Sequence, residues 1–478
     1  MLEPIVCVDN SWGFSRRDEI PWNYKKDITL FSDLTTKKEN INKKNICLMG
    51  RKTWDGIPLK FRPLKHRINI IVSQTLSINE PDIFTVKTIE EGVKLCLDMY
   101  LEQKVERVFV IGGKSLYDYA LKSVLLKQVH ITQINKYYYC DNYFDKKLLF
   151  QKCYNDMTHH INLVENDTEL NYYLYKSHQK YEGEEKYLAL MWNCINKNNL
   201  NFRATRNSNT WSCFGGQLEF DLKKGFPLTT TRKTFLRSIF YELKMFLLGE
   251  TDTKKWLSDK GIKIWEGNTS REFLDNMNLN NYPVGCMGNM YGFQWSHYGC
   301  DYDPSKTEYQ GFNQIKYVLD LLKKDKYSRR ILITSYDPSR ANQGPLFPCH
   351  SLILQFYVEN DNELCVHMYQ RSADAFLGEN FNIASTSLLL ILFTIVLNND
   401  PEYKETKFIP GRVIISLGDY HIYESHLEAL KIQLSRIPYS YPKINIKKQT
   451  NNFADFEFED IEIIDYNCYP HIQASMIA

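Results

Sequence analysis

Residues 108–121, VFVIGGKSLYDYAL, join a short run of β-branched and aromatic residues to a helical pattern through Gly112 and Gly113. A strand that turns into a helix in this way is typical of the crossover units that build parallel sheets. Similar strands, reading IVCV, ICLM, INIIV, VHITQI and YYLY, alternate with helical stretches such as residues 88–100. The alternation predicts one α/β domain over residues 1–178 with a largely parallel sheet.

A polar stretch, SHQKYEGEEK at residues 177–186, follows the last of these strands and is broken by Gly183. It predicts an exposed linker at 179–186 and a second domain at 187–478. There we expect helices near 185–197 and 234–248, and strands near 211–222, 330–336, 350–358, 363–370 and 411–416. This order predicts an α+β domain. The apolar run LLLILFTIVL at 388–397 is about half of the ~20 residues that a membrane span needs, which predicts a buried helix.

Composition narrows the function classes. The formal net charge is +2, so the chain as a whole does not attract nucleic acid or acidic membranes, and any anion site must be local. The twelve cysteines show no CxxC pair or regular spacing, which predicts neither a zinc site nor a disulfide framework. The N-terminus MLEPIVCVDN resembles a strand rather than a signal peptide, and a reducing, cytoplasmic location fits best.

Asp27 lies in the stretch EIPWNYKKDITLFSDLTTKK, residues 19–38, at helical spacing from Phe31 and Leu34. A carboxylate on an apolar helix face is costly unless something pairs with it, which favours a functional acid. The alternative is that Asp27 is the N-cap of this helix.

Two strands end in glycine-containing turns that lead into helices: NICLMGRKTWDGIP at residues 45–58, and the stretch around Gly112 and Gly113. Helix N-termini rich in backbone N–H groups suit phosphate oxygens. The alternative is that these glycines only allow tight helix packing.

Cys349 precedes an alternating apolar run in GPLFPCHSLILQFYV, residues 344–358, and His350 follows it. A cysteine is a nucleophile only as the thiolate, so it needs cationic surroundings. Arg371 comes at the end of the next strand, and Arg329 and Arg330 precede an earlier one. Three converging arginines would indicate a dianionic ligand, whereas a structural cysteine would simply pack as a small hydrophobe.

The motifs IPW…D…F, MGRKTW…IP, RPL…R.N…S and VIGG…Y, in this order, resemble dihydrofolate reductase across residues 1–178. The resemblance implies that Asp27 binds the pterin and promotes protonation of N5, while a nicotinamide hydride goes to C6. It implies folate contacts from Ile5, Cys7, Phe31, Arg67 and Thr132. It implies NADPH contacts from Gly50, Arg51, Lys52, Thr53, Ser73, Gln74, Ile111, Gly112, Gly113 and Tyr117.

The motifs FPCH, QRSxD, FNIAS, GDxHxY, IW with SREFLD, YGFQW and FPLTTT resemble thymidylate synthase over about 185–478. Together the two halves resemble the bifunctional dihydrofolate reductase-thymidylate synthase family of protozoa. The resemblance implies a dihydrofolate reductase-like α/β domain followed by a thymidylate synthase-like α+β domain. Cys349 would add to C6 of dUMP, and 5,10-methylenetetrahydrofolate would supply the methyl group, yielding dTMP and dihydrofolate.

The same resemblance assigns roles in the second half. Glu242 would relay protons, Tyr291 would help to remove the C5 proton, and Trp265 would face the folate beside Asp374. The implied nucleotide site comprises Arg206, Arg371, Ser372, Asp374, Asn382, His421 and Tyr423. Arg329 and Arg330 would reach in from the partner subunit of a homodimer. The alternatives are that Trp265 and Tyr291 are core aromatics and that Glu242 is a surface charge.

Several positions depart from the family pattern. Gln74 stands where the family has an arginine, the glycine-rich phosphate loop reads Arg206-Asn207-Ser208-Asn209-Thr210, and Glu379 occupies the segment GENFN near the folate site. A second hypothesis therefore remains: an active reductase whose synthase-like half binds nucleotide and mainly scaffolds a dimer. Neither hypothesis includes a metal, a membrane or a nucleic acid.

Overall fold

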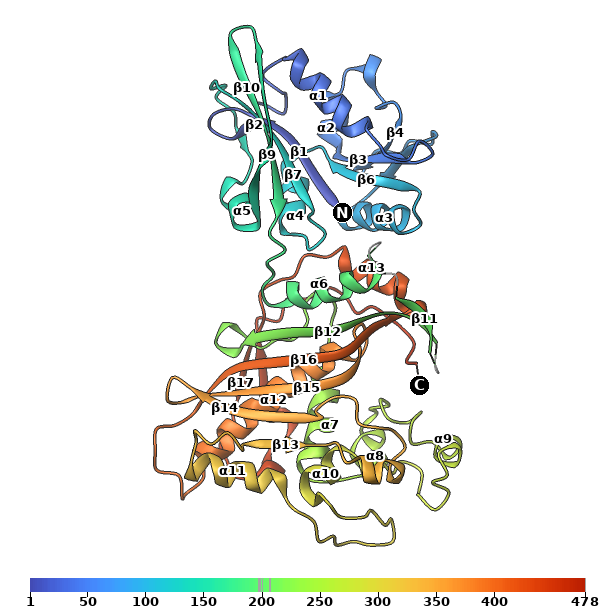
Figure 1. The fold of residues 1–478 in the computed structure, drawn as a ribbon, viewed down its shortest axis with the longest axis vertical. Helices are drawn as coiled ribbons and strands as arrows, with labels where there is room; N and C mark the ends of the chain where they lie inside the picture. The colour runs from blue at the N-terminus through green and yellow to red at the C-terminus, as the bar shows by residue number, and fades with distance from the viewer. Residues whose placement is uncertain (197–198, 200, 206–207, 478) are drawn as a thin grey trace. The chain divides into compact units, whose positions relative to one another are not determined.

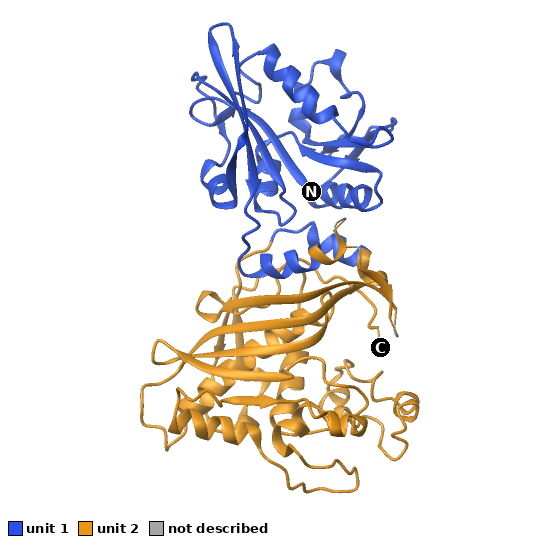
Figure 2. Cartoon of the chain, in the orientation of Figure 1, with its two compact units in different colours: residues 1–192, 428–437 blue, residues 193–427, 438–478 orange. Residues whose placement is uncertain are grey.

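The computed structural model describes residues 1–196, 199, 201–205 and 208–477. The chain forms two compact units, which Figure 2 distinguishes by colour. Unit 1 comprises Met1–Trp192 and Glu428–Ile437, and unit 2 comprises Asn193–Leu427 and Pro438–Ala478. Helix α6 (Glu184–Ile195) begins inside the segment predicted as a linker, 179–186.

Unit 1 is built on an eight-stranded sheet in the order β5-β4-β3-β6-β1-β7-β10-β9 (Figure 1). Neighbouring strands from β5 to β7 are parallel, and β10 is antiparallel to both β7 and β9. The predicted α/β architecture with a largely parallel sheet is therefore confirmed. The strands are β1 (Leu2–Val8), β3 (Lys44–Gly50), β4 (Arg67–Val72), β5 (Ile83–Val86), β6 (Val105–Val110), β7 (Gln128–Ile134), β9 (Cys153–Glu165) and β10 (Thr168–Ser177).

The helices of unit 1 connect these strands. They are α1 (Lys25–Thr36), α2 (Arg51–Gly56), α3 (Ile89–Leu101), α4 (Lys114–Lys122) and α5 (Lys146–Lys152), with a short strand pair, β2 (Gly13–Ser15) and β8 (Asn142–Tyr143), and the 3-10 turn η1 (Leu59–Phe61). Helix α2 begins directly after β3, and α4 begins after β6 through Gly112 and Gly113. Because β3 and β6 are parallel neighbours, both glycine-containing turns lie at the same edge of the sheet.

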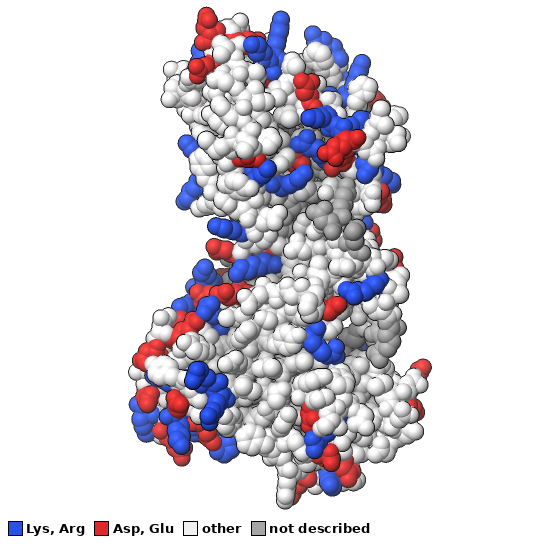
Figure 3. Space-filling model, in the orientation of Figure 1, with Lys and Arg blue, Asp and Glu red and all other residues white. Residues whose placement is uncertain are grey.

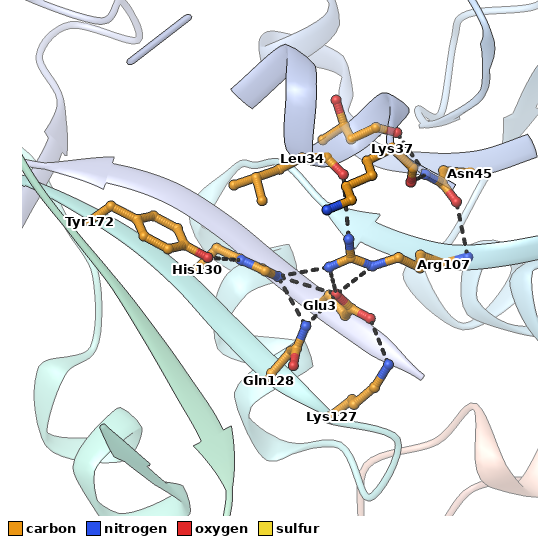
Figure 4. A network of polar contacts seen from close by, with 10 residues as sticks. Glu3, Leu34, Lys37, Asn45, Arg107, Lys127, Gln128, His130 and Tyr172 are labelled. Carbon is orange, nitrogen blue, oxygen red and sulfur yellow. Dashed lines mark hydrogen bonds and ion pairs between the residues drawn. The ribbon is translucent and has the colours of Figure 1, made fainter. Parts of the chain in front are cut away.

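A buried carboxylate, Glu3 on β1, holds together several strands of unit 1 (Figure 4). Its side chain is 1% exposed and pairs with the guanidinium of Arg107 and, at 3.3 Å, with Lys127 Nζ. Gln128 Nε2 donates to it at 2.8 Å, and His130 Nε2 lies 3.2 Å away. Burial alone would raise the pKa of Glu3, but the His130 hydrogen bond and the Arg107 guanidinium outweigh burial and hold the pKa well below its usual range.

Replacing Glu3 by glutamine should lower the free energy of unfolding of unit 1 by about 3 kcal/mol at neutral pH, because the partly buried Arg107 guanidinium loses its counter-charge. Since the folded-state pKa is depressed, the stabilisation is present above the unfolded pKa and is lost as the pH falls through the folded value. Urea unfolding followed by reductase activity measures the effect at neutral and acidic pH. Glu102→Gln, at an exposed acid paired with Lys104, is the control. Equal unfolding midpoints for the two variants at neutral pH would contradict the prediction.

Unit 2 is built on a six-stranded sheet in the order β11-β12-β16-β15-β14-β13. Its strands are β11 (Phe202–Ala204), β12 (Asn209–Asp221), β13 (Leu332–Thr334), β14 (Ile353–Glu359), β15 (Glu363–Asp374) and β16 (Ile409–Tyr423), with a separate pair β17 (Lys443–Ile446) and β18 (Ile461–Ile464). Its helices are α7 (Leu236–Leu247), α8 (Thr253–Trp256), α9 (Arg271–Asn276), α10 (Tyr291–His297), α11 (Gln314–Lys324) and α12 (Glu379–Asn398), whereas α13 (Leu427–Leu434) lies almost wholly in unit 1. The 3-10 turns are η2 (Leu222–Lys224), η3 (Ser258–Lys260), η4 (Pro338–Gln343), η5 (Glu424–His426), η6 (Phe453–Asp455) and η7 (Phe458–Asp460). The predicted α+β class is confirmed.

Helix α12 packs against α7 and against strands β15 and β16. Among the described residues it is the one helix whose length and composition would allow it to cross a membrane, yet 78% of its most apolar window is buried inside the protein. The apolar run at 388–397 is therefore a core helix, as predicted.

The opposite face of the unit 2 sheet is open in this chain. Strand β14 alternates buried and exposed residues, and its exposed side chains include Ile353 and Tyr357. Tyr369 on β15 lies directly opposite Ile353 and is also exposed. Positive and negative side chains are interspersed over the face shown in Figure 3, and few charges lie over strands β14, β15 and β16. One sheet face thus presents apolar and aromatic side chains to solvent.

Two candidate active sites

A cavity of about 1040 Å³ opens in unit 1 at the edge where β3 and β6 lead into α2 and α4. Its wall draws on β1, on helices α1, α2 and α4, and on the loops before α1. The predicted residues that line it are Ile5, Cys7, Asp27, Phe31, Gly50, Arg51, Lys52, Thr53, Ile111, Gly112, Gly113, Tyr117 and Thr132. The fold thus gathers most of the residues proposed for folate and NADPH around one cavity.

Asp27 lies in the first turn of α1 and faces the cavity. The N-cap of α1 is Tyr24, so the alternative that Asp27 caps the helix is wrong. Cys7 and Thr132 are register partners on the parallel strands β1 and β7, and both side chains hydrogen-bond the Asp27 carboxyl. Burial nevertheless raises the pKa of Asp27 above its ordinary value, against the lowering effect of these hydrogen bonds. The carboxyl therefore keeps its proton to a higher pH than an exposed aspartate does.

The other end of the cavity has the features of an anion site. Gly112 has a φ of +133°, and a Cβ there would lie 2.8 Å from Thr53 Oγ1. A side chain at this position would fill the space at the start of α4, so the turn requires glycine. Arg51 Nε pairs with Asp55 at 2.6 Å, and Lys52 Nζ pairs with Asp18 at 2.8 Å.

Both of these ion pairs are exposed to solvent, and such pairs contribute only about 0–1 kcal/mol. Either cation can therefore turn to an anionic ligand at little cost. Tyr117 lies beneath this end of the cavity, where its hydroxyl donates to the Ile5 carbonyl oxygen at 3.0 Å.

Three predicted residues of unit 1 are not brought to the cavity wall. Arg67 is buried and donates to Thr35 Oγ1 at 2.7 Å and to the Lys65 carbonyl oxygen at 3.0 Å. The Ser73 hydroxyl accepts the backbone N–H of Leu76 at 3.0 Å. Gln74 Nε2 donates to the Lys87 carbonyl oxygen at 2.9 Å. The ligand contacts expected of these three side chains stay predictions.

The sequence analysis did not assign several lining residues, among them Trp22, Leu34, Ile57 and Leu64. Leu34 shares a helix face with Asp27 and Phe31, so its helical spacing carried the signal. Trp22 hydrogen-bonds the Cys7 thiol from the loop before α1. No sequence periodicity extends into that loop, so only the fold reveals this contact.

The second candidate site centres on Cys349 in unit 2. Tyr291, 58 positions earlier, places its hydroxyl 3.6 Å from Cys349 Sγ and accepts the Cys349 backbone N–H at 3.2 Å. The His350 ring stacks on Tyr291 with centroids 4.5 Å apart. Burial raises the pKa of the Cys349 thiol, and this effect outweighs the lowering by the Tyr291 hydroxyl and the Arg371 guanidinium.

Arg371 holds the loop that carries the cysteine. Its Nε donates to the Pro348 carbonyl oxygen at 2.9 Å, its Nη2 donates to the Phe347 carbonyl oxygen at 3.0 Å, and its backbone N–H donates to the Cys349 carbonyl oxygen at 3.0 Å. The predicted cation is therefore beside the cysteine, and it also fixes the backbone on which the thiol sits.

A buried acid completes this group. Trp265 Nε1 donates to Glu242 Oε1 at 2.7 Å, and the ring of Trp265 lies 6.1 Å from that of Tyr291. Burial raises the pKa of Glu242 to about 7, against the lowering effect of the Trp265 hydrogen bond. Glu242 is buried, so the alternative of a surface charge is wrong. Trp265 binds this acid, and Tyr291 is a buried aromatic that also reaches the cysteine.

The remaining predicted residues of unit 2 lie in the last residues of β15 and β16 and, for Asn382, in the first turn of α12. Asn382 Nδ2 donates to Gln370 Oε1 at 3.1 Å, and Gln370 Nε2 donates to the Ser372 carbonyl oxygen at 3.1 Å. His421 Nδ1 lies 2.8 Å from Asp419 Oδ1, and the Tyr423 ring stands edge-on to that of His421. Gln370 orients Asn382, and Asp419 orients His421. The sequence analysis did not assign Gln370 or Asp419, because their effect depends on how the strands pair.

The last predicted residues differ in their surroundings. Asp374 Oδ1 accepts the backbone N–H groups of Phe376 and Leu377, each at 3.0 Å. Arg329 and Arg330 are exposed just before β13. Arg206 lies outside the described residues. Within the described part of the chain, no group of three or more His, Cys, Asp or Glu side chains could hold a metal ion.

Comparisons with known proteins match two separate stretches of the chain to two families. The family model described as dihydrofolate reductase matches residues 1–176, and the one described as thymidylate synthase matches residues 185–478. A protein of Leishmania major named bifunctional dihydrofolate reductase-thymidylate synthase is 34% identical and covers 99% of this chain and 94% of its own length. A protein of the same name from Paramecium tetraurelia is 35% identical and covers 99% of this chain and 98% of its own length. The protein named bifunctional dihydrofolate reductase-thymidylate synthase 2 of Arabidopsis thaliana is 33% identical and covers 99% of this chain and 88% of its own length.

Proposed function

We propose that this chain, which belongs to the family of bifunctional dihydrofolate reductase-thymidylate synthases, catalyses two consecutive reactions. The synthase half methylates dUMP to dTMP with 5,10-methylenetetrahydrofolate and releases dihydrofolate. The reductase half reduces dihydrofolate to tetrahydrofolate with NADPH. The observation that carries the proposal is that one chain holds both a partly buried acid in a large cavity and a cysteine grouped with a tyrosine and a buried glutamate.

In the reductase half, Asp27 is the proton-handling residue. Reduction adds a hydride to C6 and a proton to N5 of dihydrofolate, so the site needs a group that retains a proton near neutral pH. The raised pKa of Asp27 supports this role, and Thr132 and Cys7 fix the direction of its carboxyl. Phe31 and Ile5 form apolar wall beside it, and Arg67 is proposed to hold the folate carboxylate.

NADPH supplies the hydride when it is bound. The space left by Gly112, together with Gly113, Gly50 and Thr53, fits a ligand that approaches the backbone closely. Arg51 and Lys52 supply positive charge for its phosphates. The proposed set is completed by Ile111 and Tyr117 on the cavity wall, and by Ser73 and Gln74 beyond it.

In the synthase half, the thiolate of Cys349 forms a bond to C6 of dUMP, which makes C5 nucleophilic toward the methylene carbon of the folate. Tyr291 removes the C5 proton, and Glu242, whose pKa lies at about 7, relays protons near the nucleotide. A hydride from the folate completes the methyl group, and the Cys349 bond then breaks to release dTMP. Trp265 holds Glu242 in place and faces the folate with Asp374.

The nucleotide contacts are proposed from the same group of residues. Arg371, Ser372 and Arg206 bind the phosphate, Asn382 binds the pyrimidine, and His421 and Tyr423 bind the ribose. In the free protein, burial keeps the Cys349 pKa high, so thiolate formation depends on groups that assemble with the substrate.

One assay tests the whole proposal. The purified chain is supplied with dUMP and 5,10-methylenetetrahydrofolate, and dTMP is measured by chromatography; NADPH oxidation by dihydrofolate is measured separately. We expect both activities. NADPH oxidation without dTMP formation would instead support the scaffolding alternative. The twelve free cysteines support a reducing, cytoplasmic location for this enzyme.

We further propose that the synthase half forms a homodimer through the open face of its sheet. Ile353, Tyr357 and Tyr369 on that face would otherwise stay exposed to water. A two-fold interface buries the same face of both subunits. Arg329 and Arg330 are exposed just before β13, and among the described residues neither has an ion-pair partner, so both are available to a phosphate on the other subunit.

Mixing two inactive variants tests this arrangement. Cys349→Ala and Arg329→Ala homodimers should each make little dTMP, whereas their heterodimer contains one site with an intact cysteine and an intact partner arginine. After subunit exchange we expect dTMP synthesis to recover, and each heterodimer should contribute the activity of one intact site. Lys324→Ala, at an exposed cation on α11, is the control for Arg329→Ala and should keep full activity. A monomeric mass in solution, or no recovery after verified exchange, would refute the shared site.

A further inference from the structure

Glu379 is a buried acid that the proposed mechanism leaves unused. It lies in the first turn of α12, its side chain is 0% exposed, and neither carboxyl oxygen makes a hydrogen bond of normal geometry, although the amides of Asn382 and Gln370 lie near enough to act on it. A buried carboxyl without partners is costly, because it loses its contacts with water and gains none in return. Such a group beside Asn382, a predicted nucleotide-binding residue, calls for a functional explanation.

The charges around Glu379 favour its neutral form. Burial raises its pKa to about 8, Asp374 at the end of β15 raises it further, and the amides of Asn382 and Gln370 lower it. The other titratable or charged groups on the elements packed against α12 are Arg237, Tyr241, Glu242 and Lys244 on α7, Lys316, Tyr317, Asp320, Lys323 and Lys324 on α11, Glu363, Cys365, His367, Tyr369 and Arg371 on β15, and Arg412, Asp419, Tyr420, His421 and Tyr423 on β16. None of them hydrogen-bonds the Glu379 carboxyl.

The two neighbouring amides are oriented by a backbone carbonyl. Gln370 Nε2 donates to the Ser372 carbonyl oxygen at 3.1 Å, which leaves Gln370 Oε1 to accept the Nδ2 of Asn382 at 3.1 Å. The amide group of Asn382 is thereby fixed, because a carbonyl oxygen can only accept. A neutral Glu379 leaves this relay undisturbed, whereas a carboxylate accepts hydrogen bonds only and attracts the NH₂ groups of both amides toward itself.

We propose that Glu379 is a positioning residue which, as a neutral acid, keeps the Asn382 amide in the orientation that selects uracil over cytosine. Uracil presents an N–H and a carbonyl oxygen where cytosine presents a ring nitrogen and an NH₂ group. A 180° rotation of the Asn382 amide exchanges its donor and its acceptor, and would therefore reverse the preference for uracil over cytosine. The inference rests on the proposed function, in which Asn382 binds the pyrimidine.

The test compares the parent with Glu379→Gln, which has the same shape and no charge at any pH, and with Glu379→Leu, which removes all hydrogen bonding. Dissociation constants for dUMP and dCMP are measured by calorimetry on the full chain at about pH 7 and about pH 9. In the parent the dUMP preference should fall about tenfold over this range, because the fraction with the neutral acid falls by that factor. In both variants the preference should not change with pH.

The ionisation of dUMP and dCMP with pH is the same whichever protein is used. A difference in pH dependence between the parent and a variant therefore comes from the Glu379 side chain. NADPH oxidation by dihydrofolate should be the same in all three proteins and serves as the internal control. If Glu379→Gln does not fold, Glu379→Leu alone decides the outcome. If the parent makes dTMP but its preference for dUMP over dCMP equals that of Glu379→Leu at both pH values, this inference is wrong and the proposed function stands. If the parent makes no dTMP and does not bind dUMP, both fail.

Discussion

Cys349→Ala should abolish dTMP synthesis, with a loss on the order of 10⁴-fold or more, because no other group can form the bond to C6 of dUMP. The variant should fold, since the change removes one sulfur atom from a partly buried site. Its NADPH oxidation with dihydrofolate should be unchanged, because the reductase cavity is lined by unit 1 alone. Chromatography of dTMP and a spectrophotometric NADPH assay on the same sample measure both results.

A covalent adduct provides an independent check of the nucleophile. With 5-fluoro-dUMP and 5,10-methylenetetrahydrofolate, C5 carries no proton for Tyr291 to remove, so the complex should be trapped on the parent. Peptide mapping should locate the adduct at Cys349. Cys300→Ala, at another partly exposed cysteine, is the matched control and should form the adduct normally. An adduct on any other cysteine, or normal dTMP synthesis by Cys349→Ala, would refute the assignment.

Asp27→Asn should lower kcat/KM for reduction of dihydrofolate at neutral pH by about 10²–10⁴-fold, the contribution typical of a positioned proton donor. The amide keeps the size of the side chain but cannot supply a proton to N5. Because burial raises the Asp27 pKa, the parent rate should decline only at a pH above the ordinary titration range of aspartate, as the carboxyl ionises. The variant should recover activity only at low pH, where solvent can protonate the substrate.

The control for this prediction is on the same helix. Asp33 is exposed on α1, so Asp33→Asn changes the charge of the helix without reaching the cavity and should retain the parent rate and pH profile. The dTMP synthesis of Asp27→Asn should also equal that of the parent. Equal reductase turnover in Asp27→Asn and Asp33→Asn at neutral pH would remove Asp27 from the mechanism.

The sequence alone determined the two-part architecture of this protein. Alternating strands and helices predicted the parallel sheet of unit 1, since the polar and apolar spacing of each element is a local property. The spacing of Asp27, Phe31 and Leu34 put an acid on the inner face of α1, and all three line the cavity. The order of the motifs predicted both family matches.

Only the tertiary structure decided which groups share an environment. It brought Tyr291 to Cys349, buried Glu242 against Trp265, and left Glu379 in the core without a hydrogen bond of normal geometry. It also placed Ser73 and Gln74 away from the cavity wall. The physical reason is that burial and hydrogen bonding depend on segments far apart in the chain. Those contacts set the pKa values and orientations on which the chemistry depends, and neither residue type nor spacing contains them.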